Sequence, residues 1–165
     1  MKRIDFRTDV LPLKDRLFRL ALRVTLDRAE AEDITQETLV RLWEARDQWP
    51  QIQSIEAYAT TVCRRLALDY NRRVRPSTSE AEVVDTPASA PGPDDMLDQR
   101  QRIQAIRNLI DQLPEVQRTV IQLRDIEGLR YDEIAQVTGL SETQVKVYLH
   151  RARKKLKETL APQQP

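Results

Sequence analysis

The sequence predicts an all-α protein of two small helical domains joined by a flexible linker, with a helix-turn-helix in the C-terminal domain. Glycine, a poor helix former, occurs only three times in 165 residues. Apolar residues recur every three or four positions on both sides of one proline-rich segment, which is the spacing of amphipathic helices. That segment, residues 75–95, holds four of the nine prolines, as linkers often do. We therefore expect domains at residues 1–75 and 96–165, with the linker at 76–95.

Three helices are expected in the N-terminal domain. The first carries Leu17, Leu20, Ala21 and Val24 on one face. Asp27 is a suitable N-cap for a second helix over about 28–47, because its carboxylate can accept hydrogen bonds from the first free N–H groups. A loop marked by Pro50 follows, and Ser54 then caps a third, long helix that ends in an arginine-rich segment.

Four helices are expected in the C-terminal domain. The first covers about 94–112, and Pro114 suits the first turn of the second because a missing N–H costs nothing there. Gly128 ends the second helix as a C-terminal cap. A short helix over about 130–137, a turn at 138–140 and a final helix over about 141–159 follow.

The last two predicted helices have the spacing of a helix-turn-helix. Ala135 is small enough to let the helices cross closely, and Gly139 can adopt the positive φ that the turn requires. Val145 would pack under the first helix, and Ser141 is a natural N-cap for the second. The second helix of this motif enters the major groove by its N-terminal half. The residues expected to reach base edges or phosphates are Thr143, Gln144, Lys146, Val147, His150, Arg151, Arg153 and Lys154.

Charge is distributed unevenly, although the net charge is only +1. Residues 64–75 contain five Arg and one Asp, residues 76–98 contain six acidic and no basic residues, and residues 141–157 contain six Lys or Arg and one Glu. Two basic segments that each end an amphipathic helix favour a polyanionic partner. Aromatic residues could stack on unpaired bases. Trp43 and Tyr58 are expected in the core, whereas Trp49, in the loop before a basic helix, is expected to be exposed.

Composition argues against several classes of function. The single cysteine, Cys63, has no disulfide partner, and one Cys with one His cannot supply a structural zinc site, so we expect no metal and no cofactor. No apolar stretch is long enough to cross a bilayer, and the charged N-terminus is unlike a signal peptide; we expect a cytoplasmic protein without membrane insertion. The carboxylates of Glu32, Asp33 and Glu37 fit a solvated face or a protein interface better than acid–base catalysis, so an enzyme is not expected.

Two motifs resemble those of one known family. AEDITQETLVRLW, residues 31–43, and SIEAYATTVCRRLALDYNRR, residues 54–73, are similar to successive helices of region 2 in the extracytoplasmic function (ECF) sigma factors of the sigma-70 family. LPEVQRTVIQLRDIEGLRYDEIAQVTGLSETQVKVYLHRARKKLK, residues 113–157, resembles region 4 of that family. The motifs occur in the family's order, with a short linker in place of region 3. The resemblance implies an RNA polymerase sigma factor that binds core RNA polymerase and directs promoter recognition, promoter melting and transcription initiation.

The resemblance also implies roles for particular residues. In the helix that corresponds to the polymerase clamp contact, these are Asp33, Gln36, Glu37, Leu39, Val40, Leu42 and Trp43. Of these, Leu39 and Trp43 are equally compatible with the protein's own core. The loop 46–53 corresponds to the segment that captures a flipped base of the −10 element, and the residues implied for −10 binding are Trp49, Arg64, Arg65, Asp69, Arg72 and Arg73. Lys146, Val147, His150 and Arg151 match the family's −35 reading positions. An anti-sigma factor is a further implied partner.

Two other functions stay open on the residues alone. A stand-alone helix-turn-helix regulator would bind duplex DNA by itself, typically as a dimer on a palindrome, although no coiled-coil seam favours a dimer. A helical adaptor would bind only proteins and would show no salt-dependent DNA affinity. A plain helical hairpin with a glycine turn and a basic end would fit such an adaptor, because basic side chains near a helix C-terminus are favourable in any case.

Overall fold

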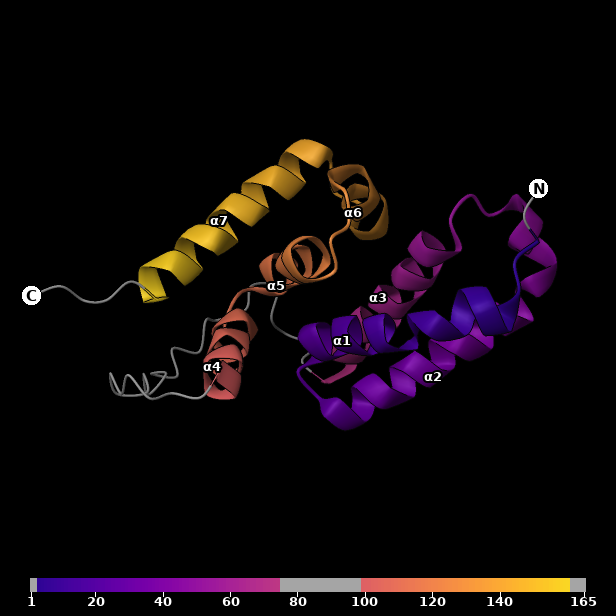
Figure 1. Ribbon diagram of the computed structural model, residues 1–165, viewed down its shortest axis with the longest axis horizontal. Coiled ribbons are helices and arrows are strands. Elements are labelled where there is room, and N and C mark those ends of the chain that lie inside the picture. Colours follow the sequence, from indigo (N-terminus) through magenta and orange to yellow (C-terminus); the bar gives the residue numbers. More distant parts are fainter. Residues whose placement is uncertain (1–2, 75–98, 161–165) are drawn as a thin grey trace, which may run out of the picture.

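The computed structural model describes residues 3–74 and 99–160, and every regular element in these two ranges is helical. The all-α prediction is therefore confirmed. The predicted linker, 76–95, lies outside the described residues. Figure 1 shows the N-terminal helices α1–α3 at one end of the molecule and α4 and α7 at the other, with α5 between them.

The N-terminal unit is a bundle of three helices, α1 (Lys14–Thr25), α2 (Arg28–Glu44) and α3 (Ile55–Val74), that all contact one another. A π-helical turn, Phe6–Val10, and a 3-10 turn, Leu11–Leu13, precede it. The predicted inner face of the first helix is buried in full, as Leu17, Leu20, Ala21 and Val24. The bundle therefore forms around α1, as its apolar spacing predicts.

Local hydrogen bonds set the ends of these helices. Asp27 accepts the N–H of Glu30 at 3.1 Å and caps α2, and the Ser54 hydroxyl oxygen accepts the N–H of Ala57 at 3.1 Å at the start of α3. Both predicted caps are confirmed. Helix α2 ends at Glu44, earlier than expected, because the predicted loop folds into a 3-10 turn over Arg46–Gln51.

The C-terminal unit contains α4 (Gln99–Asp111), α5 (Glu115–Ile121), α6 (Tyr131–Thr138) and α7 (Glu142–Leu160). A π-helical turn, Gln122–Ile126, extends α5, and Pro114 lies at the N-cap of that helix, one position before the predicted first turn. Gly128 and Gly139 have φ of 76° and 77°. Both glycines lie in the left-handed region that other residues rarely adopt, and both end a helical segment as predicted. Helices α5 and α6 pack against α7.

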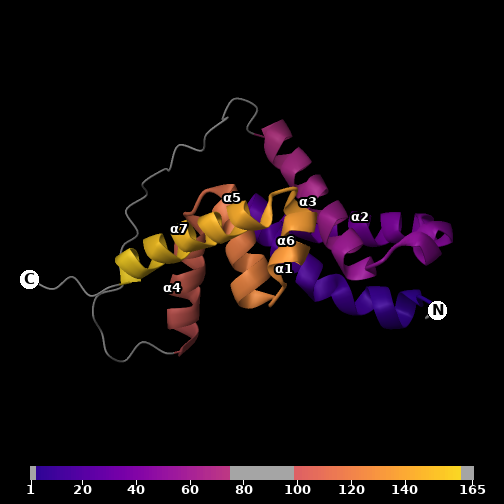
Figure 2. The same ribbon diagram turned by 90° about the horizontal axis from the view of Figure 1, so that it is seen from above.

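The two units also pack against each other. Helix α1 lies against α5, and α3 lies against α6, so the C-terminal unit covers one side of the bundle (Figure 2). The sequence left this arrangement open, because a linker allows many. Within the two described ranges, no helix is long and apolar enough to cross a membrane, and no group of three or more His, Cys, Asp or Glu is placed to hold a metal ion.

Candidate nucleic-acid interface

The turn between α6 and α7 is closed by two reciprocal hydrogen bonds. The Ser141 hydroxyl oxygen accepts the N–H of Gln144 at 3.1 Å, and the Gln144 side-chain oxygen accepts the N–H of Ser141 at 2.9 Å. This capping box satisfies two N–H groups at the start of α7. The Gln144 side-chain oxygen that accepts the N–H of Ser141 is the atom that a glutamine needs for pairing with adenine. In this structure Gln144 therefore serves to start the helix.

Helix α7 has one buried side and one exposed side. Val145, Leu149 and Ala152 are buried and fix the helix on the rest of the unit. The predicted −35 residues on the opposite side are all exposed, and the structure brings them together at helical spacing: Thr143, Lys146, Val147, His150, Arg151 and Lys154, with Arg153 beside them. A straight, basic, solvent-facing helix surface of this kind can enter a major groove.

Tyr131, at the first position of α6, organises several cations next to this surface. The Arg124 guanidinium lies 4.7 Å from the centre of its ring and the Lys146 ammonium 5.6 Å, so two cations share one aromatic side chain. Arg153 forms an ion pair with Asp125 at 2.6 Å. The hydrogen bond and charge of Asp125, together with a contact to Tyr131, raise the pKa of the Arg153 guanidinium. Sequence reasoning missed Tyr131; its position at the start of the first helix of the motif was the only signal.

Helix α3 presents its predicted −10 residues unevenly. Arg65, Asp69, Arg72 and Arg73 are exposed. Arg64 differs, because its side chain is only 12% exposed and its guanidinium lies 3.5 Å from a carboxylate oxygen of Glu115 in α5. In this arrangement Arg64 cannot reach DNA.

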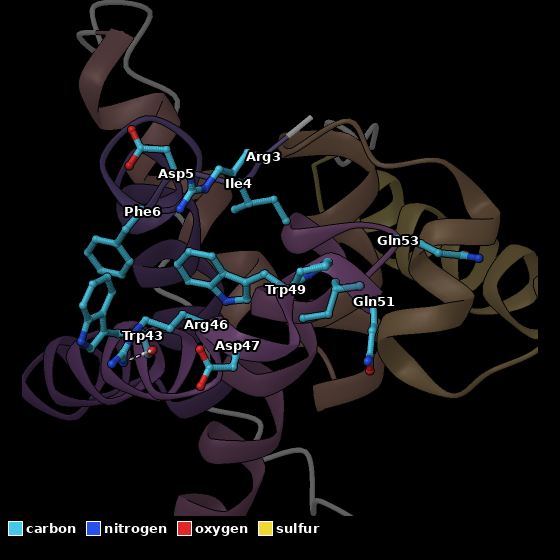
Figure 3. A pocket seen from close by; sticks show the side chains of 12 residues that line it. Arg3, Ile4, Asp5, Phe6, Trp43, Arg46, Asp47, Trp49, Gln51 and Gln53 are labelled. Atoms are coloured by element: carbon cyan, nitrogen blue, oxygen red, sulfur yellow. Dashed lines mark hydrogen bonds between the residues drawn. The ribbon is translucent and has the colours of Figure 1, made fainter. Parts of the chain in front are cut away.

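An aromatic pocket of about 1140 Å³ lies at the end of the bundle where α2 leads into α3 (Figure 3). The ring centres of Phe6 and Trp43 are 5.4 Å apart and nearly perpendicular, and those of Phe6 and Trp49 are 6.5 Å apart and nearly parallel. The Arg46 guanidinium lies 4.5 Å from the Trp43 ring centre. Polar side chains of Asp47, Gln51 and Gln53 also line the pocket. Aromatic walls with nearby polar groups suit a flat, unstacked base.

The expected exposure of the two tryptophans is wrong. Trp49 is only 7% exposed, and its indole N–H donates to the carbonyl oxygen of Leu42 at 3.0 Å, whereas Trp43 is 48% exposed. The reason is that the segment after α2 folds back as a 3-10 turn and Phe6 stacks on Trp49 from the N-terminal segment. Trp43 is therefore the more exposed of the two tryptophans that line the pocket.

The outer side of α2 carries the residues implied for polymerase binding. Asp33, Gln36, Glu37, Val40 and Trp43 are exposed, and Leu39 is half-buried. Leu42 is fully buried, so the expectation that it contacts a partner is corrected: its side chain belongs to the core. Val40, 49% exposed, and Trp43 form an apolar strip flanked by acidic and amide side chains, which is the composition of a protein contact surface.

Comparison with known proteins divides the chain into the same two parts. The family Sigma-70 region 2 matches residues 10–76, and the family Sigma-70, region 4 matches residues 103–156. The ECF RNA polymerase sigma factor SigL of Mycobacterium tuberculosis is 34% identical over 151 residues, which cover 87% of this chain and 82% of SigL. This chain belongs to the ECF sigma factors of the sigma-70 family. Region 2 thus holds α1–α3 and the 3-10 turn over Arg46–Gln51, and region 4 holds the helix-turn-helix.

Two further matches agree with this membership. The ECF RNA polymerase sigma factor SigE of Mycolicibacterium smegmatis is 31% identical over 150 residues, which cover 89% of this chain and 58% of SigE, so the chain spans less than two thirds of that relative. The sigma factor RpoE from Bartonella quintana, solved in complex with the anti-sigma factor NepR, has the same fold, with a TM-score of 0.74 and 24% identity over 97% of this chain and 99% of that one.

Proposed function

We propose that this protein is a transcription initiation factor, not an enzyme, that binds core RNA polymerase in the cytoplasm and directs it to promoters with a −10 and a −35 element. The observation that carries the proposal is the pairing of two matched sigma regions, in order, with an exposed basic recognition helix in the second. Neither region alone offers the contact area of a tight, specific DNA complex. Two regions that each bind DNA weakly bind it more tightly when they are linked and held by one polymerase.

Three surfaces contribute in this proposal, and Trp43 borders two of them, the outer side of α2 and the aromatic pocket. The outer side of α2 binds the polymerase through Asp33, Gln36, Glu37, Leu39, Val40 and Trp43. Helix α3 and the aromatic pocket handle the melted −10 strand, with the pocket receiving an unstacked base and Arg65, Arg72 and Arg73 near the backbone. Helix α7 reads the −35 duplex. The working domain limits are 1–75 and 96–165, joined by 76–95.

An anti-sigma factor is proposed as a further partner. RpoE of Bartonella quintana was solved with NepR, and CnrH was solved with the cytosolic domain of CnrY. The apolar strip of Val40 and Trp43 on α2 and the exposed Ile103 and Ile106 on α4 give this chain surfaces on which a regulator could compete with the polymerase.

In vitro transcription tests the proposal. Purified protein is added to bacterial core polymerase on a library of promoter fragments, and we expect initiation that depends on the protein at a shared pair of sequence elements. Lys146→Glu reverses a charge on the exposed side of α7 and should lower initiation at least about tenfold, in line with the loss of a good base contact. Lys14→Glu makes the same charge change at an exposed site on α1 and should leave initiation unchanged.

The alternatives give different results. A stand-alone regulator would bind one duplex site tightly without polymerase and would not support initiation. An adaptor would give neither initiation nor salt-dependent DNA binding. Either result, with folded protein, would contradict the sigma assignment.

A further inference from the structure

We propose that Phe6, in the turn ahead of α1, is a positioning residue for base capture: it holds the two tryptophans of the aromatic pocket in the geometry that receives an unstacked base. Phe6 lies before residue 10, where the match to Sigma-70 region 2 begins, so that match gives it no role. The consequence for DNA rests on the function proposed above, whereas the positioning of the rings does not.

The turn that carries Phe6 is closed by its own hydrogen bonds. The backbone N–H of Asp5 donates to Asp9 Oδ2 at 2.8 Å, and the backbone N–H of Asp9 donates to the carbonyl oxygen of Asp5 at 2.8 Å. The Thr8 hydroxyl donates to the Asp5 carboxylate at 3.1 Å. Val10, the last residue of the turn, is fully buried, and the turn contacts both α2 and α3. A fixed backbone therefore presents Phe6 to the place where α2 leads into α3.

The Phe6 ring contacts both tryptophans of the pocket (Figure 3). Its centre lies 5.4 Å from that of Trp43, with the ring planes at 77°, and 6.5 Å from that of Trp49, with the planes at 9°. The two tryptophan ring centres are 6.5 Å apart, at 68°. Stacked and edge-to-face pairs at such separations are favourable arrangements of aromatic rings. Because Trp43 lies near the end of α2 and Trp49 in the 3-10 turn, Phe6 joins two segments of the pocket wall.

Trp43 is the tryptophan whose orientation depends more on Phe6. Trp49 has a hold of its own, because it is buried and its indole N–H donates to the carbonyl oxygen of Leu42 at 3.0 Å. Trp43 is half-exposed, and the Arg46 guanidinium lies 4.5 Å from its ring centre and donates to its carbonyl oxygen at 3.0 Å. Arg46 is exposed, and a long arginine side chain has many rotamers. The half-buried Phe6 is therefore the more rigid of these two supports.

A ring that is fixed before DNA arrives should capture a base more readily. A base that leaves the duplex loses its stacking, which an aromatic side chain can replace. Binding to a ring that is already oriented avoids the entropy cost of immobilising that side chain. Without the Phe6 ring, Trp43 should sample more orientations and base capture should weaken. The −35 duplex is read by α7 in the proposed function, so binding to that element should not change.

The positioning of the rings is tested on the free, full chain. Trp43 and Trp49 are its only tryptophans, so tryptophan emission reports this cluster alone. Phe6→Leu keeps an apolar side chain but removes the ring, and we expect emission at longer wavelength and stronger quenching by acrylamide. Phe6→Tyr keeps the ring and should match the parent. Unchanged emission and quenching in Phe6→Leu, folded by far-UV circular dichroism, would overturn the proposal.

The matched control is the same substitution at the other phenylalanine of the chain. Phe18 is also half-buried and packs on the core from α1, and it does not line the pocket. Phe18→Leu should therefore leave the emission and quenching of the tryptophans as they are in the parent. An equal change in Phe18→Leu and Phe6→Leu would mean that the emission follows the general packing of the bundle, which also contradicts positioning by Phe6.

The role in base capture is tested with core polymerase on a promoter found by the initiation assay described above. An abasic nucleotide replaces each non-template position of the −10 element in turn, and the position whose loss slows opening most in the parent marks the captured base. Permanganate reactivity of unpaired thymines follows opening. On the intact promoter, Phe6→Leu should slow opening about fivefold, the lower end of what stacking one base contributes. Its affinity for a duplex with only the −35 element should equal that of the parent.

Coupling between Phe6 and that one base separates positioning from general destabilisation. On the promoter that is abasic at the captured position, the pocket has no base to receive, so Phe6→Leu and the parent should open it equally fast. Phe6→Tyr and Phe18→Leu should open the intact promoter as the parent does. Opening of the intact promoter by Phe6→Leu at the parent rate, or an equal slowing on both promoters, would overturn the proposal and leave the sigma assignment intact. A parent chain that fails to initiate at all would contradict the sigma assignment, and base capture with it, while the emission measurement still decides whether Phe6 positions the rings.

Discussion

Helices α3 and α7 are both proposed to bind DNA, yet they differ in how much of their surface is exposed for that contact. Helix α7 buries one side through Val145, Leu149 and Ala152 and leaves the other free. Helix α3 buries Ala57, Ala59, Cys63 and Ala67 while contacting α1, α2 and α6, so less of its surface remains. A recognition helix at the edge of a unit is ready for DNA as folded, whereas one in the middle depends on what its neighbours cover.

Both helices begin at a serine cap, but the segments that lead into them are fixed in different ways. The turn before α7 is fixed by Ser141 and Gln144, three residues apart, through hydrogen bonds that need nothing else in the molecule. The segment before α3 is anchored by Trp49, which reaches into the core under Phe6 and bonds to Leu42. The reading surface of α7 is therefore defined by local sequence, and that of α3 by tertiary packing.

The largest effect is expected from removing the Arg118 guanidinium, through which region 4 donates hydrogen bonds to the C-terminal end of α1 in region 2. Arg118→Met keeps the length of the side chain but leaves the carbonyl oxygens of Arg23, Val24 and Leu113 without its donors, so we expect about 2–3 kcal/mol lower free energy of unfolding. Urea titration followed by circular dichroism measures it. Arg107→Met, at an exposed position on α4, should stay within about 0.5 kcal/mol of the parent. Equal effects of the two variants would mean that Arg118 does not hold the regions together.

A smaller effect is expected at the anchor before α3. Trp49→Phe keeps an aromatic ring but leaves the carbonyl oxygen of Leu42 without the indole donor, and should cost about 1–2 kcal/mol. Trp43→Phe, at a half-exposed ring, should change the free energy of unfolding by less than about 0.5 kcal/mol. The same urea titration compares them. A larger loss at Trp43 than at Trp49 would restore the sequence-based expectation that the structure reverses.

The features that the sequence could predict are those set by local sequence rather than by tertiary packing. The caps at Asp27, Ser54 and Gly139 depend on a few neighbouring residues, so local rules place them correctly. The exposed side of α7 follows from helical spacing, and all its predicted residues lie in solvent.

The expectations that failed depend on residues far along the chain. Trp49 is buried because Phe6 stacks on it, and Arg64 is covered because Glu115, 51 positions away, lies against it. Leu42 sits on the buried side of a helix whose outer side carries the partner residues, a distinction that a motif match alone does not make. Side-chain burial was thus predictable where packing is local and not where it is distant.

The smallest effect is expected from the Tyr131 ring, which contacts Lys146 of α7 and Arg124. Tyr131→Leu removes the ring shared by Arg124 and Lys146, so Lys146 should sample more orientations and affinity for short duplex DNA at low salt should fall about fivefold. Tyr131→Phe keeps the ring and should bind as the parent does. Fluorescence anisotropy with the full chain measures both, and binding to single-stranded DNA, which we propose α3 and the pocket carry, should not change in either variant. Equal losses in the Leu and Phe variants would mean that the hydroxyl rather than the ring matters, and a loss on both kinds of DNA would mean that Tyr131 supports the fold instead of positioning the reading surface of α7.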